Sequence, residues 1–154
     1  METLFTWLEM TAVATWVREG ESLLAFPTIL TVHTFGLGLL VGAAAVMNLR
    51  LLGIGWRAPI AAFRSLFPVM WIGFWLNAIT GTMLFMAQAS NRGTSAFFMA
   101  KMLFVVVGVA STMLIRRRVF DAPPDTAVPA RALATVSFVA WIAVITTGRL
   151  LAYL

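Results

Sequence analysis

The sequence contains no cysteine and few charged residues, and both features restrict the kind of protein it encodes. Without cysteine the chain has no disulfide, no thiolate metal site and no covalently attached c-type haem. Charged residues make up 11% of the chain, whereas hydrophobic residues make up 61%. A soluble domain usually carries about a quarter charged residues. The composition therefore indicates an integral membrane protein in contact with the lipid bilayer.

Several motifs are also missing. There is no Gly-x-Ser-x-Gly sequence and no second histidine, which argues against a hydrolase. The long apolar stretches contain no Asp or Glu, which argues against a proton-coupled transporter. The net charge of +5 does not indicate nucleic-acid binding, because the arginines lie in loops that flank apolar stretches.

Four apolar stretches are long enough to cross a bilayer as helices, which takes about 20 residues. They run over about residues 23–47, 66–88, 96–115 and 131–153. Ahead of them, about residues 3–18 combine tryptophans with Glu9 and Arg18, which predicts a short helix at the membrane surface. We predict a single domain over residues 1–154, an all-α integral membrane four-helix bundle with a short N-terminal interfacial helix.

Arginine is distributed unevenly between the two ends of this bundle. Seven arginines fall in the two loops on one side, namely Arg50, Arg57, Arg64, Arg116, Arg117, Arg118 and Arg131. The opposite side carries only Arg18 and Arg92, together with several glutamates. Short loops rich in arginine stay in the cytoplasm. For a bacterial chain this predicts a multi-pass protein of the inner membrane with both termini in the periplasm.

Three ionisable side chains fall inside the predicted spans: His33, Lys101 and Arg149. His33 is the only histidine and lies about ten residues into its span, or ~15 Å deep at ~1.5 Å per residue. Lys101 and Arg149 each lie about five residues from the outer end of theirs. Ionisable groups inside a membrane usually mark function. All three occupy the outer half of the bundle.

This layer has the chemistry of a b-type haem site. A neutral imidazole ligates haem iron, so His33 is the candidate ligand. Gly36 and Gly38 lack the side-chain bulk that would keep a flat ring away. The second axial ligand is open: another copy's His33, a methionine, or none. The remaining residues predicted for the site, as walls and as partners of the propionates, are Trp71, Trp75, Lys101 and Arg149.

The leading hypothesis is therefore a membrane redox subunit that passes electrons to or from a partner, as a homo-oligomer or in a larger redox complex. The alternative is a structural or assembly subunit without a cofactor. A lone intramembrane histidine can simply hydrogen-bond a neighbouring helix, and Lys101 and Arg149 can extend to water. Gly38 and Gly42 form a GxxxG motif, which is typical of helix packing.

Copper handling on the periplasmic side is a third hypothesis. Met83 and Met86 end the second span, and Met99 and Met102 begin the third. Thioethers suit Cu(I), although methionine is also a common gap-filler in apolar packing. Nearby, Asn77, Thr80 and Thr82 form a polar stripe for which we predict hydrogen bonds between helices.

The stretch from Trp16 to Gly53 contains the motifs W-V-R-E-G-E-S, F-P, V-H-T-F-G-L-G-L-L-V-G and N-L-R-L-L-G. It resembles an uncharacterised family of small bacterial four-helix membrane proteins, and more remotely it is similar to the membrane domain of copper-resistance D proteins. The resemblance continues through Thr80 and Gly81, Phe98 to Lys101, and Gly148. It implies the membrane fold, the histidine at position 33 and the lysine at position 101. Asn48 stands where the family pattern has an Asp.

Overall fold

The computed structural model describes residues 2–19, 25–55, 57–123, 129–151 and 153. These residues form helices and short connections, and they include no β-strand. Four helices are long and apolar enough to cross a membrane, namely α3 (Ala25–Leu52), α4 (Leu66–Met86), α6 (Ala96–Ile115) and α7 (Ala130–Leu150). The prediction of an all-α, multi-pass membrane bundle is confirmed.

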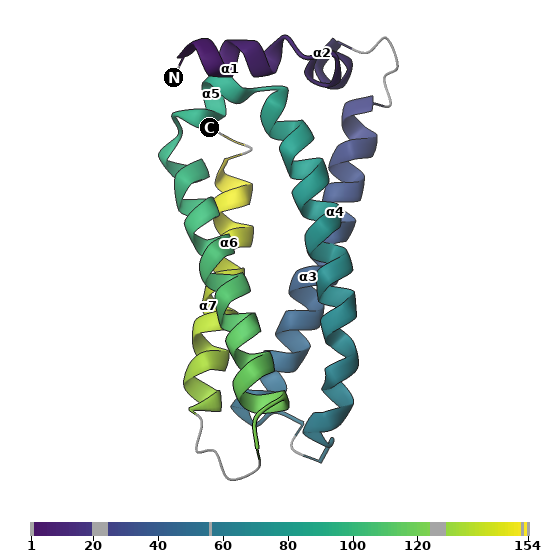
Figure 1. Cartoon of the computed structure of the whole chain (residues 1–154), viewed down its shortest axis with the longest axis vertical. Coiled ribbons are helices and arrows are strands. Elements are labelled where there is room, and N and C mark those ends of the chain that lie inside the picture. Colours follow the sequence, from purple (N-terminus) through teal and green to yellow (C-terminus); the bar gives the residue numbers. More distant parts are fainter. Residues whose placement is uncertain (1, 20–24, 56, 124–128, 152, 154) are drawn as a thin grey trace.

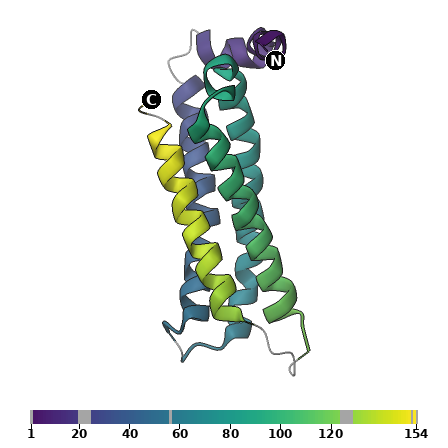
Figure 2. The same ribbon diagram turned by 90° about the vertical axis from the view of Figure 1, so that its left-hand side faces the viewer.

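The four long helices run side by side along the long axis of the molecule (Figures 1 and 2). α3 packs against α4, α6 packs against α7, and α3 also packs against α7. α4 and α6 are the neighbours that do not pack closely on each other. The bundle is thus two tight helix pairs joined through α3 and α7.

Two glycines set the close approach of α3 and α4. A Cβ atom on Gly73 would lie 2.6 Å from the Leu40 amide nitrogen and 2.7 Å from the Gly36 carbonyl oxygen. A Cβ atom on Gly36 would lie 2.9 Å from the Leu76 Cβ. Within a bilayer, helices associate through such close packing, because lipid is as apolar as their side chains.

The densest part of the core lies in the inner half of the bundle, on the side of the arginine-rich loops. Met47 and Ile115 are fully buried there. Trp141 lies against Gly108, whose added Cβ would be 2.9 Å from the indole ring. Asn48 is also fully buried, and its amide donates a hydrogen bond to Ser137 Oγ over 3.1 Å. This polar pair joins α3 to α7.

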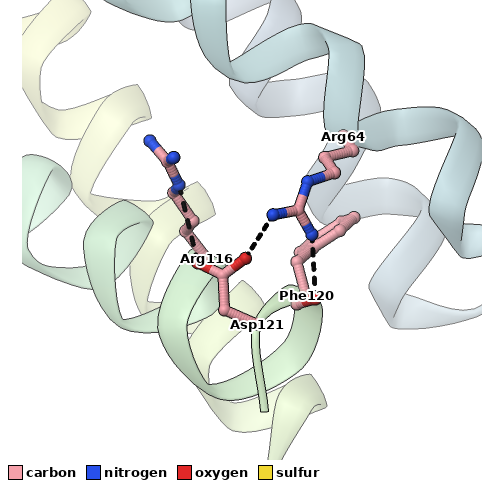
Figure 3. Close-up of polar contacts among 4 residues, drawn as sticks. All are labelled: Arg64, Arg116, Phe120 and Asp121. Carbon is pink, nitrogen blue, oxygen red and sulfur yellow. Dashed lines mark hydrogen bonds and ion pairs between the residues drawn. The ribbon is translucent and has the colours of Figure 1, made fainter.

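At the inner end, an ion-pair cluster connects the loop before α4 to the end of α6 (Figure 3). Arg64 lies at 2.6 Å from Asp121 and donates a second hydrogen bond to the Phe120 carbonyl over 3.0 Å. Arg116 lies 3.6 Å from the same carboxylate. The cluster ties the 3₁₀ helix η1 (Ile60–Ser65) to the π-helical turn η2 (Arg116–Phe120). Because its side chains are exposed, each pair contributes at most about 1 kcal/mol.

Two short helices, α1 (Glu2–Glu9) and α2 (Ala12–Glu19), lie across the outer end of the bundle (Figure 1). The sequence predicted one helix over residues 3–18, but the helix is interrupted at Met10 and Thr11. The Thr11 hydroxyl accepts a bond from the Ala14 amide over 3.4 Å, which fits a new helix start. Both helices expose large apolar side chains, as expected at a membrane surface, among them Leu4, Trp7, Val13 and Trp16.

The predicted boundaries of the long helices differ slightly from the structure. α3 continues to Leu52 instead of ending near residue 47, because Asn48 and Leu51 pack into the inner core. α4 ends at Met86 rather than 88, and the connector after it contains the short helix α5 (Ala89–Gly93). α7 covers Ala130–Leu150 rather than 131–153. The predicted start of the first span, residue 23, lies outside the described residues.

Candidate functional site

A cavity of about 330 Å³ lies between the two helix pairs and is lined by all four long helices. Its walls are mostly apolar, and its aromatic members are Phe74, Phe85, Phe98 and Trp141. His33 reaches it from α3, Asn77 and Thr82 from α4, and Lys101 from α6. A few polar groups in an apolar hollow of this size are typical of a small-molecule site.

The hydrogen bonds around His33 favour one tautomer. His33 Nδ1 lies 2.9 Å from Thr80 Oγ1, which also lies 2.5 Å from the Leu76 carbonyl oxygen. With the imidazole hydrogen on Nδ1, both contacts form hydrogen bonds at once, because Thr80 then accepts from His33 and donates to Leu76. In a neutral imidazole the other nitrogen, Nε2, then carries a lone pair. His33 thus presents the atom that binds metals and accepts hydrogen bonds.

α4 also fixes the position of the His33 ring and backbone. The Asn77 amide donates to the His33 carbonyl oxygen over 3.0 Å. Gly81 leaves space for the ring, since an added Cβ there would lie 3.1 Å from His33 Cε1. The predicted inter-helix hydrogen bonds of Asn77 and Thr80 are confirmed, whereas Thr82 bonds within its own helix to the Ala78 carbonyl.

Lys101 supplies positive charge to the same cavity. Its side chain lies along Gly148 of α7, where an added Cβ would be 3.6 Å from Nζ. Its charge is within electrostatic range of His33, and Arg92 of α5 is in turn within electrostatic range of Lys101. In the described part of the chain, Lys101 forms no ion pair with a carboxylate. The outer half of the cavity is therefore suited to an anionic group.

An aromatic stack closes the outer end of the cavity. Phe85 of α4 and Phe98 of α6 are stacked with ring centroids 4.8 Å apart. Phe5 of α1 meets Phe85 edge-on at 6.3 Å and lies directly against Gly93. Glu9 adds a polar contact by accepting a hydrogen bond from the Ser90 amide over 2.7 Å. Helix α1 thus lies over the outer end of the cavity.

His33 and Lys101 both line the cavity, whereas the other residues predicted for the site lie elsewhere. Gly36 lies at the α3–α4 crossing, and Gly38 lies on the exposed face of α3. Trp75 is 60% exposed, and Trp71 lines a second, smaller cavity. Arg149 is exposed and covers the Tyr153 ring at 5.3 Å. Contrary to the prediction, these five residues do not line the cavity.

Sequence reasoning did not assign several residues that shape the site. Thr80 and Gly81 were visible only as part of a polar stripe and a short motif, and their contact with His33 depends on how α3 and α4 face each other. Arg92, which bonds to the Leu151 carbonyl at the outer end of α7, is a cation near this end of the bundle that the predicted site did not include. Phe98 was visible only as the start of a short motif, and Phe85 carried no signal because phenylalanine is common throughout the spans.

The methionines of the copper hypothesis face different surroundings. Met83 packs with Val17 and Ile29, whereas Met99 is 63% exposed on α6. Met102 lines the main cavity. Among the described residues, no three His, Cys, Asp or Glu side chains lie close enough together to hold a metal ion.

Comparisons with protein-family models, with curated proteins and with solved structures gave no match. The fold and the cavity define a class on their own: a four-helix membrane bundle with an internal apolar cavity that holds one histidine and one lysine.

Proposed function

We propose that this chain is a membrane redox subunit that binds a b-type haem in the main cavity, with His33 as an axial ligand. The observation that carries the proposal is the hydrogen bond from His33 Nδ1 to Thr80. Histidines that ligate metals almost always donate their other ring N–H to such a partner, which fixes the tautomer and the ring orientation. When bound, haem supplies one-electron chemistry at its iron.

The other residues of the cavity fit the same group. Phe74 and Trp141 provide apolar wall, and the volume is at the lower end of the range for small-molecule sites. α4 and α6 do not pack closely on each other, and the edge of a ring larger than the cavity would have to enter between them. Lys101 faces the cavity without an ion-pair partner in the described chain and is the candidate partner for a propionate. Arg92 adds positive charge at the outer end of the bundle, within electrostatic range of Lys101.

Met102 is the candidate for the second axial position. It is the one methionine among the residues that line the cavity. Histidine and methionine together ligate haem in electron-transfer cytochromes and raise the reduction potential. Without a second ligand the site would instead be open to small molecules.

The proposal includes the orientation predicted from the sequence. The arginine-rich end would lie in the cytoplasm, and the cavity would lie on the periplasmic side of a bacterial inner membrane. Reporter fusions after Leu154 and within residues 124–128 test this. A periplasmic reporter at the C-terminus and a cytoplasmic reporter in the loop are expected, and the reverse pattern would contradict the orientation.

Haem titration tests the binding itself. Protein produced under haem limitation and purified in detergent is expected to bind one equivalent of haem b, with a Soret band that His33→Ala abolishes or shifts. Arg149→Gln serves as the matched control, since Arg149 lies outside the cavity. Equal titration of the wild type and His33→Ala would contradict the proposal.

A second candidate function rests on the outer surface of α3. Gly38 and Gly42 are exposed there, and an added Cβ at either would meet nothing within 4 Å. Such a GxxxG face suits contact with another membrane helix, as in a cofactor-free assembly subunit or a homo-oligomer. This candidate predicts that Gly38→Leu abolishes cross-linking to a partner while His33→Ala leaves it intact. Unchanged cross-linking of Gly38→Leu would contradict it.

A further inference from the structure

A second cavity, of about 20 Å³, adjoins the inner end of the main one. The two share Leu40, Phe74 and Trp141 as lining residues. The small cavity is lined mainly by apolar side chains, and Trp141 and Thr112 also line it. These two residues come from the adjacent helices α7 and α6.

Two residues that line the small cavity, Trp141 and Thr112, each have a buried polar atom without a hydrogen-bond partner within the described chain. Trp141 is 2% exposed and Thr112 is 7% exposed. Neither Trp141 Nε1 nor Thr112 Oγ1 has a hydrogen-bond partner within the described chain. Thr112 does not donate to its own helix, as Ser111 does by bonding to the Gly108 carbonyl over 2.9 Å. A buried polar group without a partner costs roughly 1–3 kcal/mol.

We infer that this small cavity is an internal water site, in which one water molecule bonds to Trp141 Nε1 and Thr112 Oγ1. The indole N–H only donates, and the hydroxyl both donates and accepts, so a water satisfies both. One water needs about 10–15 Å³ of such space and at least two polar partners, and this cavity supplies both. A larger ligand group would not fit here.

The water site would add a hydrogen-bonding group at the inner end of the main cavity. Trp141 contacts both spaces, so a polar group of any ligand that reaches the inner end of the main cavity would meet an exchangeable proton there. The other two described residues that line both cavities, Leu40 and Phe74, have no hydrogen-bonding side chain. The inference does not depend on haem binding.

Nuclear magnetic resonance of the haem-free full chain in lipid nanodiscs tests the site. With labelled tryptophan, the indole proton of Trp141, assigned with Trp141→Phe, is expected to show magnetisation transfer with water. Trp75 provides the dry control, because it is exposed on the apolar surface of α4. Absence of transfer at Trp141 in the wild type would overturn the inference.

A matched pair of variants separates this water from any water in the main cavity. Thr112→Val keeps the side-chain shape but removes the hydroxyl, and it is expected to abolish the signal at Trp141. Thr112→Ser retains a hydroxyl and is expected to keep it. A signal that is equal in Thr112→Val and the wild type would place the water in the main cavity and refute the small site.

Discussion

Thr80 Oγ1 lies 2.9 Å from His33 Nδ1 and 2.5 Å from the Leu76 carbonyl oxygen. Because a threonine hydroxyl has one hydrogen, both contacts are hydrogen bonds when Nδ1 carries the hydrogen of the imidazole. The ring lies against Gly81 of the same helix, and Nε2 remains available to a ligand in the cavity. One helix, α4, thus sets both the chemistry and the position of His33.

Replacing Thr80 with valine is expected to weaken haem binding about 10- to 100-fold, the usual effect of removing the hydrogen-bond partner of a ligating histidine. Thr80→Ser keeps the hydroxyl and is expected to bind haem like the wild type. Thr146→Val is the control, because the Thr146 hydroxyl bonds only to its own helix, at the Ile142 carbonyl. Haem titration followed by absorbance gives the three affinities. Equal haem affinities for Thr80→Val and Thr146→Val would show that Thr80 does not support haem binding.

A substitution at Gly81 tests the ring position without changing any hydrogen-bonding group. An alanine Cβ there would lie 3.1 Å from His33 Cε1, so the imidazole must move by a few tenths of an ångström. Gly81→Val is expected to displace it further and to weaken haem binding more than Gly81→Ala does. Gly42→Ala is the control, because its Cβ would enter open space. The ordering wild type, alanine, valine in haem affinity is the expected result, and identical affinities would contradict it.

Lys101 and Arg149 are expected to behave differently although the sequence places them at similar depth. Lys101→Met removes a charge from the cavity wall and is expected to weaken haem binding about tenfold or more, since hydrogen bonds to charged groups contribute about 1.5–3 kcal/mol. It should also lower the haem reduction potential, because a nearby positive charge favours the reduced form. Arg149→Met should change neither value, since Arg149 lies over Tyr153. Potentiometric titration of both variants decides the matter, and matching shifts would show that the two cations are equivalent.

Stability should depend on the α3–α4 crossing rather than on every glycine of the spans. In Gly73→Ala the new Cβ would come within 2.6 Å of backbone nitrogen, so the helices must separate. A loss of about 1–3 kcal/mol in the free energy of unfolding is expected, as for other overpacked sites. Gly38→Ala has nothing within 4 Å of its Cβ and should lose far less. Denaturation in mixed detergent micelles compares the two variants. Equal stability of Gly73→Ala and Gly38→Ala would show that the close contact at Gly73 does not limit the packing of α3 on α4.

The sequence was sufficient to predict the four spans, because apolar length alone marks a membrane helix. It also placed His33 and Lys101 in one layer by counting residues from the span ends. It could not determine which face each helix turns to its neighbours. In a water-soluble helix the polar face marks the outside, but here lipid-facing and buried positions are both apolar. Gly38 and Trp75 were assigned to the cavity for this reason, and both face outward.

Contacts between distant segments account for the rest of what the sequence missed. Arg92 lies in the connector between α4 and α6, yet it bonds to Gln88 and to the Leu151 carbonyl near the end of α7. Phe5 reaches Phe85 across the outer end from a helix predicted only to lie on the membrane. No local pattern encodes such pairings, since they follow from how the bundle closes.

The absorption spectrum of the protein as purified from haem-replete cells is the most direct test that this bundle holds haem through His33. We expect a Soret band that sharpens and shifts on reduction, about one haem per chain, and loss of that spectrum in His33→Ala with the fold retained by circular dichroism. A colourless wild-type preparation, or an unchanged spectrum in His33→Ala, would contradict it.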